Sequence, residues 1–546
     1  MKKKEKNKLF DNLPACAAEF IKLIIKKIRY RKKVRADVMA ELAAHFEDEL
    51  RSCETDEEKD KKAQQLIADF GDAKLLAILL RRAKKRCRPL WRTVVARTFQ
   101  TIGILILCFI IYLVWFLTGR PVITTNYVAE LNRIVRPTAD ESLNAAPLYE
   151  RAVELYNEKT SDEITKLLGT KYNEATDEQK QVIEEWLNEN EEIFNLVIAG
   201  TQKPYYWQNY ESKTGEVLSI LMPNLSGFRN LAYALRWRIW LSAEQGRYQD
   251  AFDDIKSSYR LGQHIKGDAV LIEQFVGMAI EAVAVHALRD ILSWHKIDSD
   301  RLAALQKDFE SIIADEDFVV SLKAEKLTMY DEIQRCFTDD RIGNGHIYPK
   351  RLLGLSPGLC VKERSDLNSP YLIMQILFTH PNKQQTQKSI NQLYDYVETL
   401  ATKTAAQLHA ETDVVENRLK QLIGNNIFLE VLAPAIRSII EISSRLSADV
   451  NSTLAIIAIL RYKQDTGDYP ENLEELVTVG YVKELPMDPW SDKPLVYKKT
   501  DDNFVLYGFG PNFKDDGGKV FYGAKGTAMW RGSKDEGDTV FWPVYK

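Results

Sequence analysis

The stretch TFQTIGILILCFIIYLVWFLT, Thr98–Thr118, decides how the rest of this 546-residue chain is organised. It holds twenty-one residues without a charge and is almost wholly apolar from Ile102 onward. At a rise of about 1.5 Å per residue, a helix of this length spans roughly 30 Å, the thickness of a bilayer core. Such uncharged runs are rare in soluble proteins, so the stretch predicts a transmembrane helix, residues 98–118, rather than a buried core helix.

The charges on either side predict the orientation of this helix. Met1–Arg97 carries 26 Lys and Arg against 15 Asp and Glu, whereas the remainder carries 48 against 63. Basic residues crowd just before the span, in RRAKKRCRPLWRTVVAR, and only Arg120 follows it closely. By the positive-inside rule, the N-terminus lies in the cytoplasm and the bulk of the chain lies outside. No second segment matches the first, so we expect a single-pass protein.

The six cysteines follow the same division. Those before or within the span are Cys16, Cys53, Cys87 and Cys108. Only Cys336 and Cys360 fall outside, where disulfides form. We predict a disulfide between them, which closes a loop of roughly 25 residues and contributes about 3 kcal/mol if it acts by restricting the unfolded chain. The alternative is two free buried thiols, because sequence does not give the Cα separation.

The pattern before the span predicts a cytoplasmic helical domain, residues 1–97. VRADVMAELAAHFEDEL repeats an apolar residue every four positions, as one face of a helix does. After KAQQLIADF, Gly71 can stop a helix and Asp72 can cap the next one.

The acidic helix Glu41–Leu50, followed by Phe70-Gly71-Asp72 and another helix, resembles the HAAS-type helical domain found ahead of membrane spans in bacterial proteins. The resemblance implies a protein-interaction or signalling module without chemistry, and a bacterial inner membrane. The alternative for these basic helices is attraction to anionic lipid headgroups, about 1 kcal/mol per Lys or Arg near the surface. Because the basic residues crowd the membrane junction, no nucleic-acid partner is expected.

From residue 119 to residue 445 the apolar spacing predicts an extracytoplasmic body of helical hairpins. FRNLAYALRWRIWLSAEQGRYQDAFDDIKSSYRLGQHI resembles one tetratricopeptide-type helix-turn-helix, but no second copy follows, so no regular array is expected. Between Thr338 and Gln384 the periodicity lapses into a long loop, which is typical of a functional or mobile segment. Gly354–Gly358 matches G-x-S-x-G in letters, but no strand precedes it, so a turn is favoured over a hydrolase elbow.

Residues 446–546 predict a small α+β head. A helix with an apolar stripe from Leu446 can end at Gly467. PLVYKK and NFVLYGFG then flank Thr500-Asp501-Asp502 as a β-hairpin, and TVFWPV forms a last strand. Between them, FGPNFKDDGG, Phe509–Gly518, is an acidic loop that could be a metal site or only a polar turn.

This head resembles the globular head of the type II secretion major pseudopilin. The marks, in the family's order, are Tyr462-Lys463, Asp465, Gly467, Tyr469-Pro470, Leu473, Leu476, Leu485-Pro486, Asp488-Pro489-Trp490 and Tyr507–Gly510. Because more than four hundred residues precede it here, the resemblance implies the fold more than a place in a pilus. It also implies a bound calcium ion, which takes six to eight oxygen ligands. Its predicted ligands are Asn512, Asp515, Asp516 and Asp538, and a polar turn is the alternative.

Together these features predict a mostly α multidomain protein that binds rather than catalyses. We expect a membrane-anchored scaffold that links a protein partner on the outer face to the cytoplasm. One alternative is a sensor that relays an extracytoplasmic ligand to the cytoplasmic helices. Another is an extracytoplasmic hydrolase with its site in the 338–384 loop. No P-loop, dinucleotide fingerprint or paired-histidine metal motif occurs in the chain.

Overall fold

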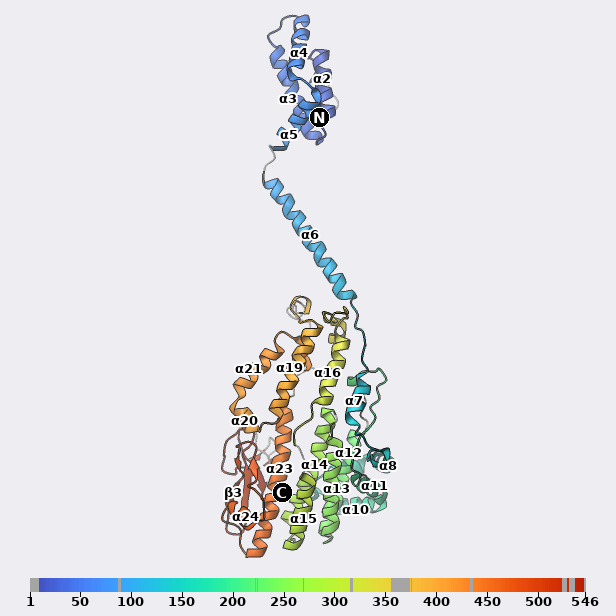
Figure 1. Cartoon of the computed structure of the whole chain (residues 1–546), viewed down its shortest axis with the longest axis vertical. Helices are drawn as coiled ribbons and strands as arrows, with labels where there is room; N and C mark the ends of the chain where they lie inside the picture. The colour runs from blue at the N-terminus through green and yellow to red at the C-terminus, as the bar shows by residue number, and fades with distance from the viewer. Residues whose placement is uncertain are drawn as a thin grey trace. The chain divides into compact units, whose positions relative to one another are not determined.

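The chain is mostly helical with a small sheet near its C-terminus, as the sequence predicts (Figure 1). Contacts divide it into two compact units, Met1–Trp115 and Phe116–Lys546. The predicted helical body and head therefore belong to one unit. The residues that this computed structural model describes are 9–86, 90–220, 222, 224–268, 270–314, 318–354, 374, 376–432, 436–522, 528–529 and 536–544.

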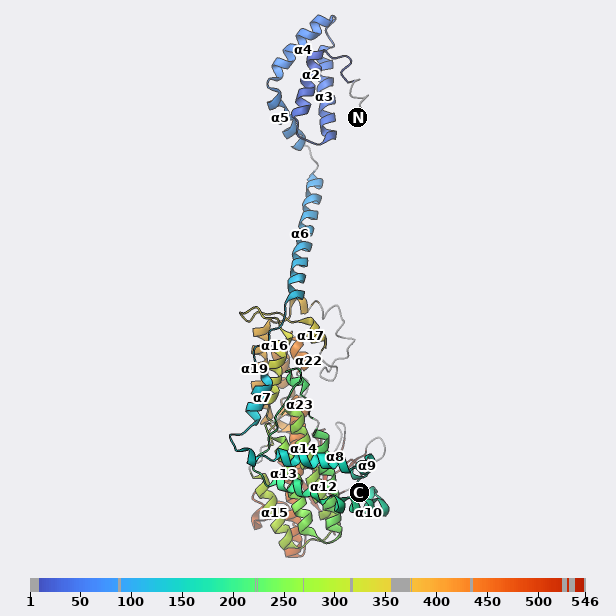
Figure 2. The ribbon, with the colours of Figure 1, turned by 90° about the vertical axis from the view of Figure 1, so that its right-hand side faces the viewer.

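The N-terminal unit contains a bundle of four helices (Figure 2). They are α2 (Ala15–Lys27), α3 (Lys32–Leu50), α4 (Asp56–Phe70) and α5 (Ala73–Arg86). The partly buried rings of Phe20 and Phe70 pack on the fully buried Phe46, with centroids 5.6 to 6.5 Å apart. As predicted, α4 stops at Gly71, whose φ of +67° favours glycine, and the Asp72 carboxylate accepts the Lys74 N–H at 2.6 Å.

Helix α6 (Leu90–Thr118) contains the predicted span. Over Val94–Thr118 only 6% of its most apolar window is buried inside the protein. Large apolar side chains such as Ile104, Leu105 and Leu107 are more than half exposed. Exposed apolar surface of this extent is costly in water but is satisfied in a lipid bilayer. The helix is therefore long and apolar enough to cross a membrane.

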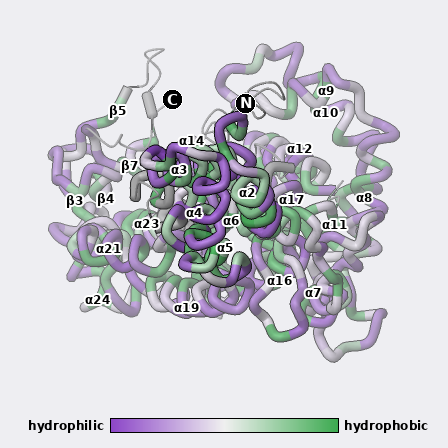
Figure 3. The backbone as a smooth tube through the Cα atoms, turned by 90° about the horizontal axis from the view of Figure 1, so that it is seen from above, coloured by the Kyte–Doolittle hydropathy of each residue, from purple (hydrophilic) through white to green (hydrophobic). Residues whose placement is uncertain are grey.

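The second unit begins with helices that build the body. Its helical elements before the last long helix are α7 (Tyr127–Val135), η1 (Glu141–Leu143), α8 (Ala146–Lys159), α9 (Asp162–Leu168), η2 (Tyr172–Glu174), α10 (Asp177–Glu189), α11 (Glu191–Thr201), η3 (Val217–Ser219), α12 (Leu225–Glu244), α13 (Tyr248–Lys266), α14 (Leu271–Trp294), α15 (Ser299–Ile313), α16 (Lys323–Cys336), α17 (Pro349–Gly354), α19 (Lys383–Ala401), α20 (Ala405–Ala410), α21 (Thr412–Ile423) and α22 (Ile427–Leu432). The segment around α9 and α10 is largely coloured hydrophilic in Figure 3, as expected for solvent-facing helices.

The predicted helix-turn-helix is confirmed as α12 and α13, which are joined at Gly246 with φ +72°. The next pair, α13 and α14, packs more tightly. A Cβ built on Gly262 would lie 2.7 Å from the Gly277 carbonyl oxygen, and one on Gly277 would lie 2.6 Å from that of Gly262. Glycine at both positions allows this close backbone approach, which holds α14 in the centre of the body.

Helix α14 is a second helix that is long and apolar enough to cross a membrane, which the sequence analysis did not identify. It differs from α6 in its surroundings, because 56% of its most apolar window is buried inside the protein. It also buries polar side chains, among them Glu273, Gln274 and Glu281. The Gln274 amide, for example, donates to the Ser321 carbonyl at 2.7 Å and accepts the Ser321 N–H at 2.9 Å.

Helix α23 (Ile436–Thr466) joins the body to the head and crosses the predicted boundary at Leu446. It packs on α14 and α15 at one side and on the head at the other (Figure 1). As predicted, it ends before Gly467, whose φ is +87°. The remaining elements of the head are α24 (Glu474–Val479), β1 (Met487–Asp488), β2 (Lys493–Pro494), β3 (Val496–Lys499), β4 (Phe504–Gly508), β5 (Phe521–Tyr522), β6 (Ala528–Met529) and β7 (Thr539–Trp542).

The main sheet of the head is antiparallel, with strand order β3-β4-β7. The predicted hairpin is confirmed, since Val496 pairs with Tyr507 and the Thr500 N–H donates to the Asn503 carbonyl at 2.9 Å. The predicted last strand is confirmed as β7, which pairs with β4. The aromatic rings of Phe504 and Trp542 stack across this pair at 5.3 Å.

A buried ion pair joins α23 to α14. The Arg289 guanidinium donates to Asp449 Oδ1 at 2.6 Å, and His286 Nε2 lies 3.4 Å from Oδ2. Arg289 and Asp449 are both almost inaccessible to solvent. Burial alone would raise the pKa of Asp449, but Arg289 and His286 hold it below its usual value.

Replacing Asp449 with Asn should destabilise the second unit by about 3 kcal/mol, because it leaves the Arg289 charge buried without its partner. Since the pKa of Asp449 is lowered by folding, this contribution is present above the ordinary aspartate pKa of about 4 and is lost as the pH falls through the folded value. Guanidinium unfolding in detergent, followed by tryptophan fluorescence at pH 7 and pH 3, measures both effects.

The matched control is Glu130→Gln, which removes an exposed carboxylate paired with Arg133 at 2.8 Å. It should cost less than about 1 kcal/mol. Equal losses in the free energy of unfolding would show that the buried pair stabilises the unit no more than an exposed pair does.

Candidate functional site

The four predicted calcium ligands all lie in one loop region between β4 and β7. The Asn512 side-chain amide donates to Asp516 Oδ2 at 2.8 Å. The Asp516 N–H donates to Asp538 Oδ1 at 3.1 Å. Asp515 is tied to the sheet, because its Oδ1 accepts the Tyr507 hydroxyl at 2.9 Å. Hydrogen bonds therefore join Asn512, Asp516 and Asp538 in one network, whereas Asp515 lies in the same loop but bonds to Tyr507 and Gly517.

Asp538 is the buried centre of this network. Its Oδ2 accepts the N–H of Gly518 at 2.7 Å and that of Lys519 at 3.3 Å, and its own N–H donates to the Lys519 carbonyl at 2.9 Å. Burial raises the pKa of Asp538, while the hydrogen bonds from Asp516 and Gly518 oppose that shift. The carboxylate immediately before β7 thus closes the acidic loop onto the sheet.

The loop carboxylates are engaged by donors rather than arranged as a cage. The Gly537 N–H and then the Asn512 amide lower the pKa of Asp516 by hydrogen bonding to its carboxylate. Among the residues that the structure describes, no three His, Cys, Asp or Glu side chains are placed to hold a metal ion. Calcium would require Asp516 and Asp538 to exchange backbone N–H donors for the ion. Calcium binding at this loop therefore stays a prediction, and so does its alternative, a polar turn.

An aromatic contact attaches the acidic loop to the helical body. The Phe513 ring stacks on the His409 ring of α20, with centroids 3.9 Å apart and planes at 9°. Phe513 has a φ of +58°, a left-handed conformation that a bulky residue rarely adopts. Both rings line a small recess of about 80 Å³ with Leu408 and Leu419. This contact, which offsets the backbone strain, was not foreseen from the sequence.

The predicted disulfide falls partly outside the described residues. Cys336 ends α16 and is fully buried, with its sulfur 3.7 Å from Glu332 Oε2. Burial raises the pKa of the Cys336 thiol well above its usual value, so it is a poor nucleophile. Cys360 lies outside the described residues, so the bond between the two stays a prediction.

The loop that could hold a hydrolase site contains a short helix. Residues 349–354, just before the G-x-S-x-G letters, form helix α17, whereas an elbow needs a strand there. Ser356 lies outside the described residues. Beneath this segment, Asp331 and Glu332 are fully buried and paired with Arg335 and Arg351 at 3.0 and 2.9 Å. Sequence reasoning missed this network: the four-residue spacing of Asp331 and Arg335 on α16 was a signal, but the pairing of Glu332 with Arg351 of α17 had none.

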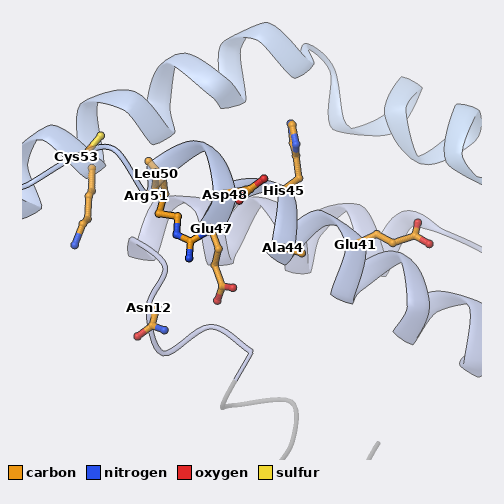
Figure 4. Close-up of a pocket in the computed structure, with 10 residues that line it drawn as sticks. Asn12, Glu41, Ala44, His45, Glu47, Asp48, Leu50, Arg51 and Cys53 are labelled. Atoms are coloured by element: carbon orange, nitrogen blue, oxygen red, sulfur yellow. The ribbon is translucent and has the colours of Figure 1, made fainter.

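A polar hollow of about 840 Å³ lies beside α3 in the N-terminal unit (Figure 4). Carboxylates from Glu41, Glu47 and Asp48 and the imidazole of His45 line it. In Figure 4 the His45 and Glu47 side chains point in opposite directions. The His45 ring instead packs edge-on against Phe70 at 5.5 Å. These groups do not converge on one point, so the hollow forms no catalytic cluster.

No protein-family profile, curated protein sequence or solved structure matches this chain. The pseudopilin and HAAS-type resemblances therefore stay expectations that rest on their sequence marks.

If the acidic loop binds calcium, the ion should stabilise the folded chain by RT ln(1 + [L]/Kd), about 2.7 kcal/mol at a hundredfold excess over Kd. Thermal unfolding of the full chain in detergent, with calcium and then with a chelator, measures this shift. The double substitution Asp515→Asn and Asp516→Asn should abolish it without removing the Asp538 contacts to the sheet. A matched control is Asp501→Asn with Asp502→Asn, in the hairpin turn. If calcium does not raise the unfolding temperature of the unmodified chain, the acidic loop is a polar turn.

Proposed function

We propose that this chain is a bacterial, single-pass membrane-anchored binding protein, a scaffold whose cytoplasmic helices and extracytoplasmic unit are joined by α6. The observation that carries the proposal is the exposed apolar surface of α6, which connects two separately packed units. Lipid would cover that surface. The basic residues before the span place the N-terminal helices in the cytoplasm under the positive-inside rule.

A single span is favoured because α14 has the features of a core helix. Its Gly277 meets the backbone of α13, and its Glu281 is fully buried, 3.3 Å from Lys266. Its Arg289 pairs with Asp449 of α23. Charged side chains at the centre of a bilayer are costly unless they face other protein segments. In a folded outer unit the same charges already have their partners.

A binding role is favoured over catalysis by how the charges are used. Asp331, Glu332 and Asp449 are each held by an arginine within 3.0 Å. A general acid must donate a proton to the substrate and a general base must accept one from it, whereas these carboxylates are engaged within the fold. The proposed role of the outer unit is therefore to bind a protein partner. Calcium would stabilise its acidic loop.

The sensor is the second candidate, and a contact at the end of α6 favours it. The His346 ring stacks on Phe116 at 4.4 Å, and its Nε2 donates to the Phe116 carbonyl at 2.8 Å. A Cβ on Gly119 would lie 2.6 Å from Thr338 Cγ2, so the chain leaving the helix is held closely. A motion of the body would therefore be passed to the end of α6.

Membrane topology is tested with single-cysteine variants in which the native cysteines are replaced by Ser. Lys213→Cys and Lys493→Cys lie before and after α14 at exposed positions. Both should react with a membrane-impermeant maleimide on intact spheroplasts, whereas a chain retaining only Cys53 should react after permeabilisation. Labelling of only one of the two outer positions would mean that α14 also crosses the membrane.

Partner binding is tested by placing a photo-cross-linking amino acid at exposed positions of the outer unit in living cells. One discrete adduct that persists when residues 9–86 are deleted supports a scaffold with an outer partner. Absence of any adduct above that of an unirradiated sample would contradict the scaffold.

The His346 contact is tested by hydrogen exchange. His346→Ala should speed exchange of the Asp339 amide, which donates to the Arg120 carbonyl at 3.2 Å, by about tenfold, or about 1.4 kcal/mol of local stability. His409→Ala, which removes an aromatic stack elsewhere in the unit, should leave that amide unchanged. Unchanged exchange in both variants would remove the structural support for a relay.

A further inference from the structure

An apolar stripe on helix α5 faces away from the N-terminal bundle. The helix lies along one side of the bundle (Figure 2), and its Ala73 and Ala77 belong to the buried core. Leu75, Ile78 and Leu79, by contrast, are 42 to 59% exposed. Because residues three and four apart lie on one face of a helix, these three side chains form a single stripe. Adjoining exposed apolar side chains are typical of a surface that binds a membrane or another protein.

Positive charge continues this stripe toward the C-terminal end of α5. Between Ala73 and Arg86 the sequence holds six Lys and Arg and no Asp or Glu. Arg82 follows Leu79 by three residues, so it extends the same face, and both Arg81 and Arg82 are exposed. Lys84 instead pairs with Glu41 of α3. The outward face of α5 therefore combines apolar side chains with basic ones that the bundle does not cover.

The chain tethers this face to the proposed span. Three residues, 87–89, separate α5 from α6, and a connection of this length reaches at most about 14 Å. The part of α6 that is apolar enough to cross a membrane begins at Val94, about 6 Å along the helix from Leu90. The headgroup region on each side of a bilayer is roughly 5 to 8 Å thick. The last turn of α5 is therefore held within reach of the headgroups.

Charge favours a lipid surface over a second copy of the chain as the molecule that covers the stripe. Two α5 helices packed face to face would bring together six basic groups from each and no acidic one. Like charges at such a contact are unfavourable. Anionic headgroups supply the opposite charge, and the layer beneath them accepts apolar side chains. Arginine can place its apolar stem along such a surface and its charge among the phosphates.

We propose that α5 docks on the cytoplasmic surface of the membrane, with Leu75, Ile78 and Leu79 between the headgroups and Arg81 and Arg82 on anionic phosphates. Docking would hold the N-terminal bundle against the bilayer. The inference rests on the proposed membrane anchoring by α6, and it adds a lipid surface to the partners of the scaffold.

The test measures the surroundings of a nitroxide spin label at Ile78→Cys. The full chain, with its native cysteines replaced by Ser, is reconstituted in vesicles of phosphatidylcholine and phosphatidylglycerol. Molecular oxygen concentrates in the bilayer, whereas a water-soluble nickel chelate stays outside it. Oxygen should therefore relax the label and nickel should not. A label at Gln64→Cys, an exposed position of α4, should show the reverse.

The two other outcomes at residue 78 would overturn the proposal. Relaxation by nickel would show that the stripe lies in water. A label reached by neither reagent would show that protein covers the stripe, either a second copy of this chain or another partner.

The role of charge is tested separately. Arg81→Gln combined with Arg82→Gln should raise nickel access at residue 78 several-fold, and so should vesicles of phosphatidylcholine alone. The matched control, Arg51→Gln combined with Lys61→Gln, removes two exposed charges elsewhere in the bundle and should leave nickel access unchanged. Equal nickel access in the two kinds of vesicle would overturn the assignment of an anionic surface.

A label within α6, at Ile104→Cys, separates this inference from the proposed anchoring. Relaxation by oxygen at residue 104 together with nickel access at residue 78 would reject the docking of α5 alone. Nickel access at residue 104 would reject the membrane anchor itself.

Discussion

The second unit depends on a buried charged pair between two long helices, Arg289 of α14 against Asp449 of α23. Two desolvated charges are tolerated only while they remain together, since either one alone would be far more costly than the pair. Leucine and isoleucine side chains could slide along the α14–α23 contact at little cost, but this pair cannot. It therefore fixes the register of α23, and α23 in turn carries the head.

That register places the other features of the head. β7 packs on α23, so the Phe541 ring meets the Arg289 guanidinium at 5.5 Å. On the opposite flank, the acidic loop reaches α20 through the stacked rings of Phe513 and His409. Hydrogen bonds also hold the head to the body, from the Ala406 N–H to the Pro489 carbonyl at 2.9 Å and from the Gln306 amide to the Tyr481 carbonyl at 2.7 Å. A left-handed phenylalanine persists only where its surroundings determine its conformation, and this stacking does so.

Local features of the fold could be predicted from the sequence, and features made by distant segments could not. The stop at Gly71, the end of α23 at Gly467 and the hairpin around residues 500–503 each depend on a few neighbouring residues, and all are confirmed. The acidic loop was recognised for the same reason, because Asp515 and Asp516 are adjacent. Asp538 was assigned to the same site only because the head resembles that of the pseudopilin, and not because of its spacing from Asp515 and Asp516.

A cavity of about 220 Å³ between the body and the head had no signal in the sequence. Tyr172, Arg236, Trp294 and Phe541 come from four separated segments, and only the packing of the head on the body brings them together. The long apolar helix α14 was missed for a related reason. Its buried glutamates and Arg289 interrupt the apolar pattern, and the partners that satisfy them lie on α13 and α23.

The same constraint separates the two proposed functions. A relay needs two arrangements of comparable free energy, and a change between them must be passed to the span. Sliding α23 against α14 would separate the buried Arg289 from Asp449, so a second arrangement inside the unit is disfavoured. The contact of His346 with Phe116 holds the residue at which the second unit begins. Such a unit can present a fixed surface at the membrane, which is what a scaffold requires, and any relay through it must displace the entire unit.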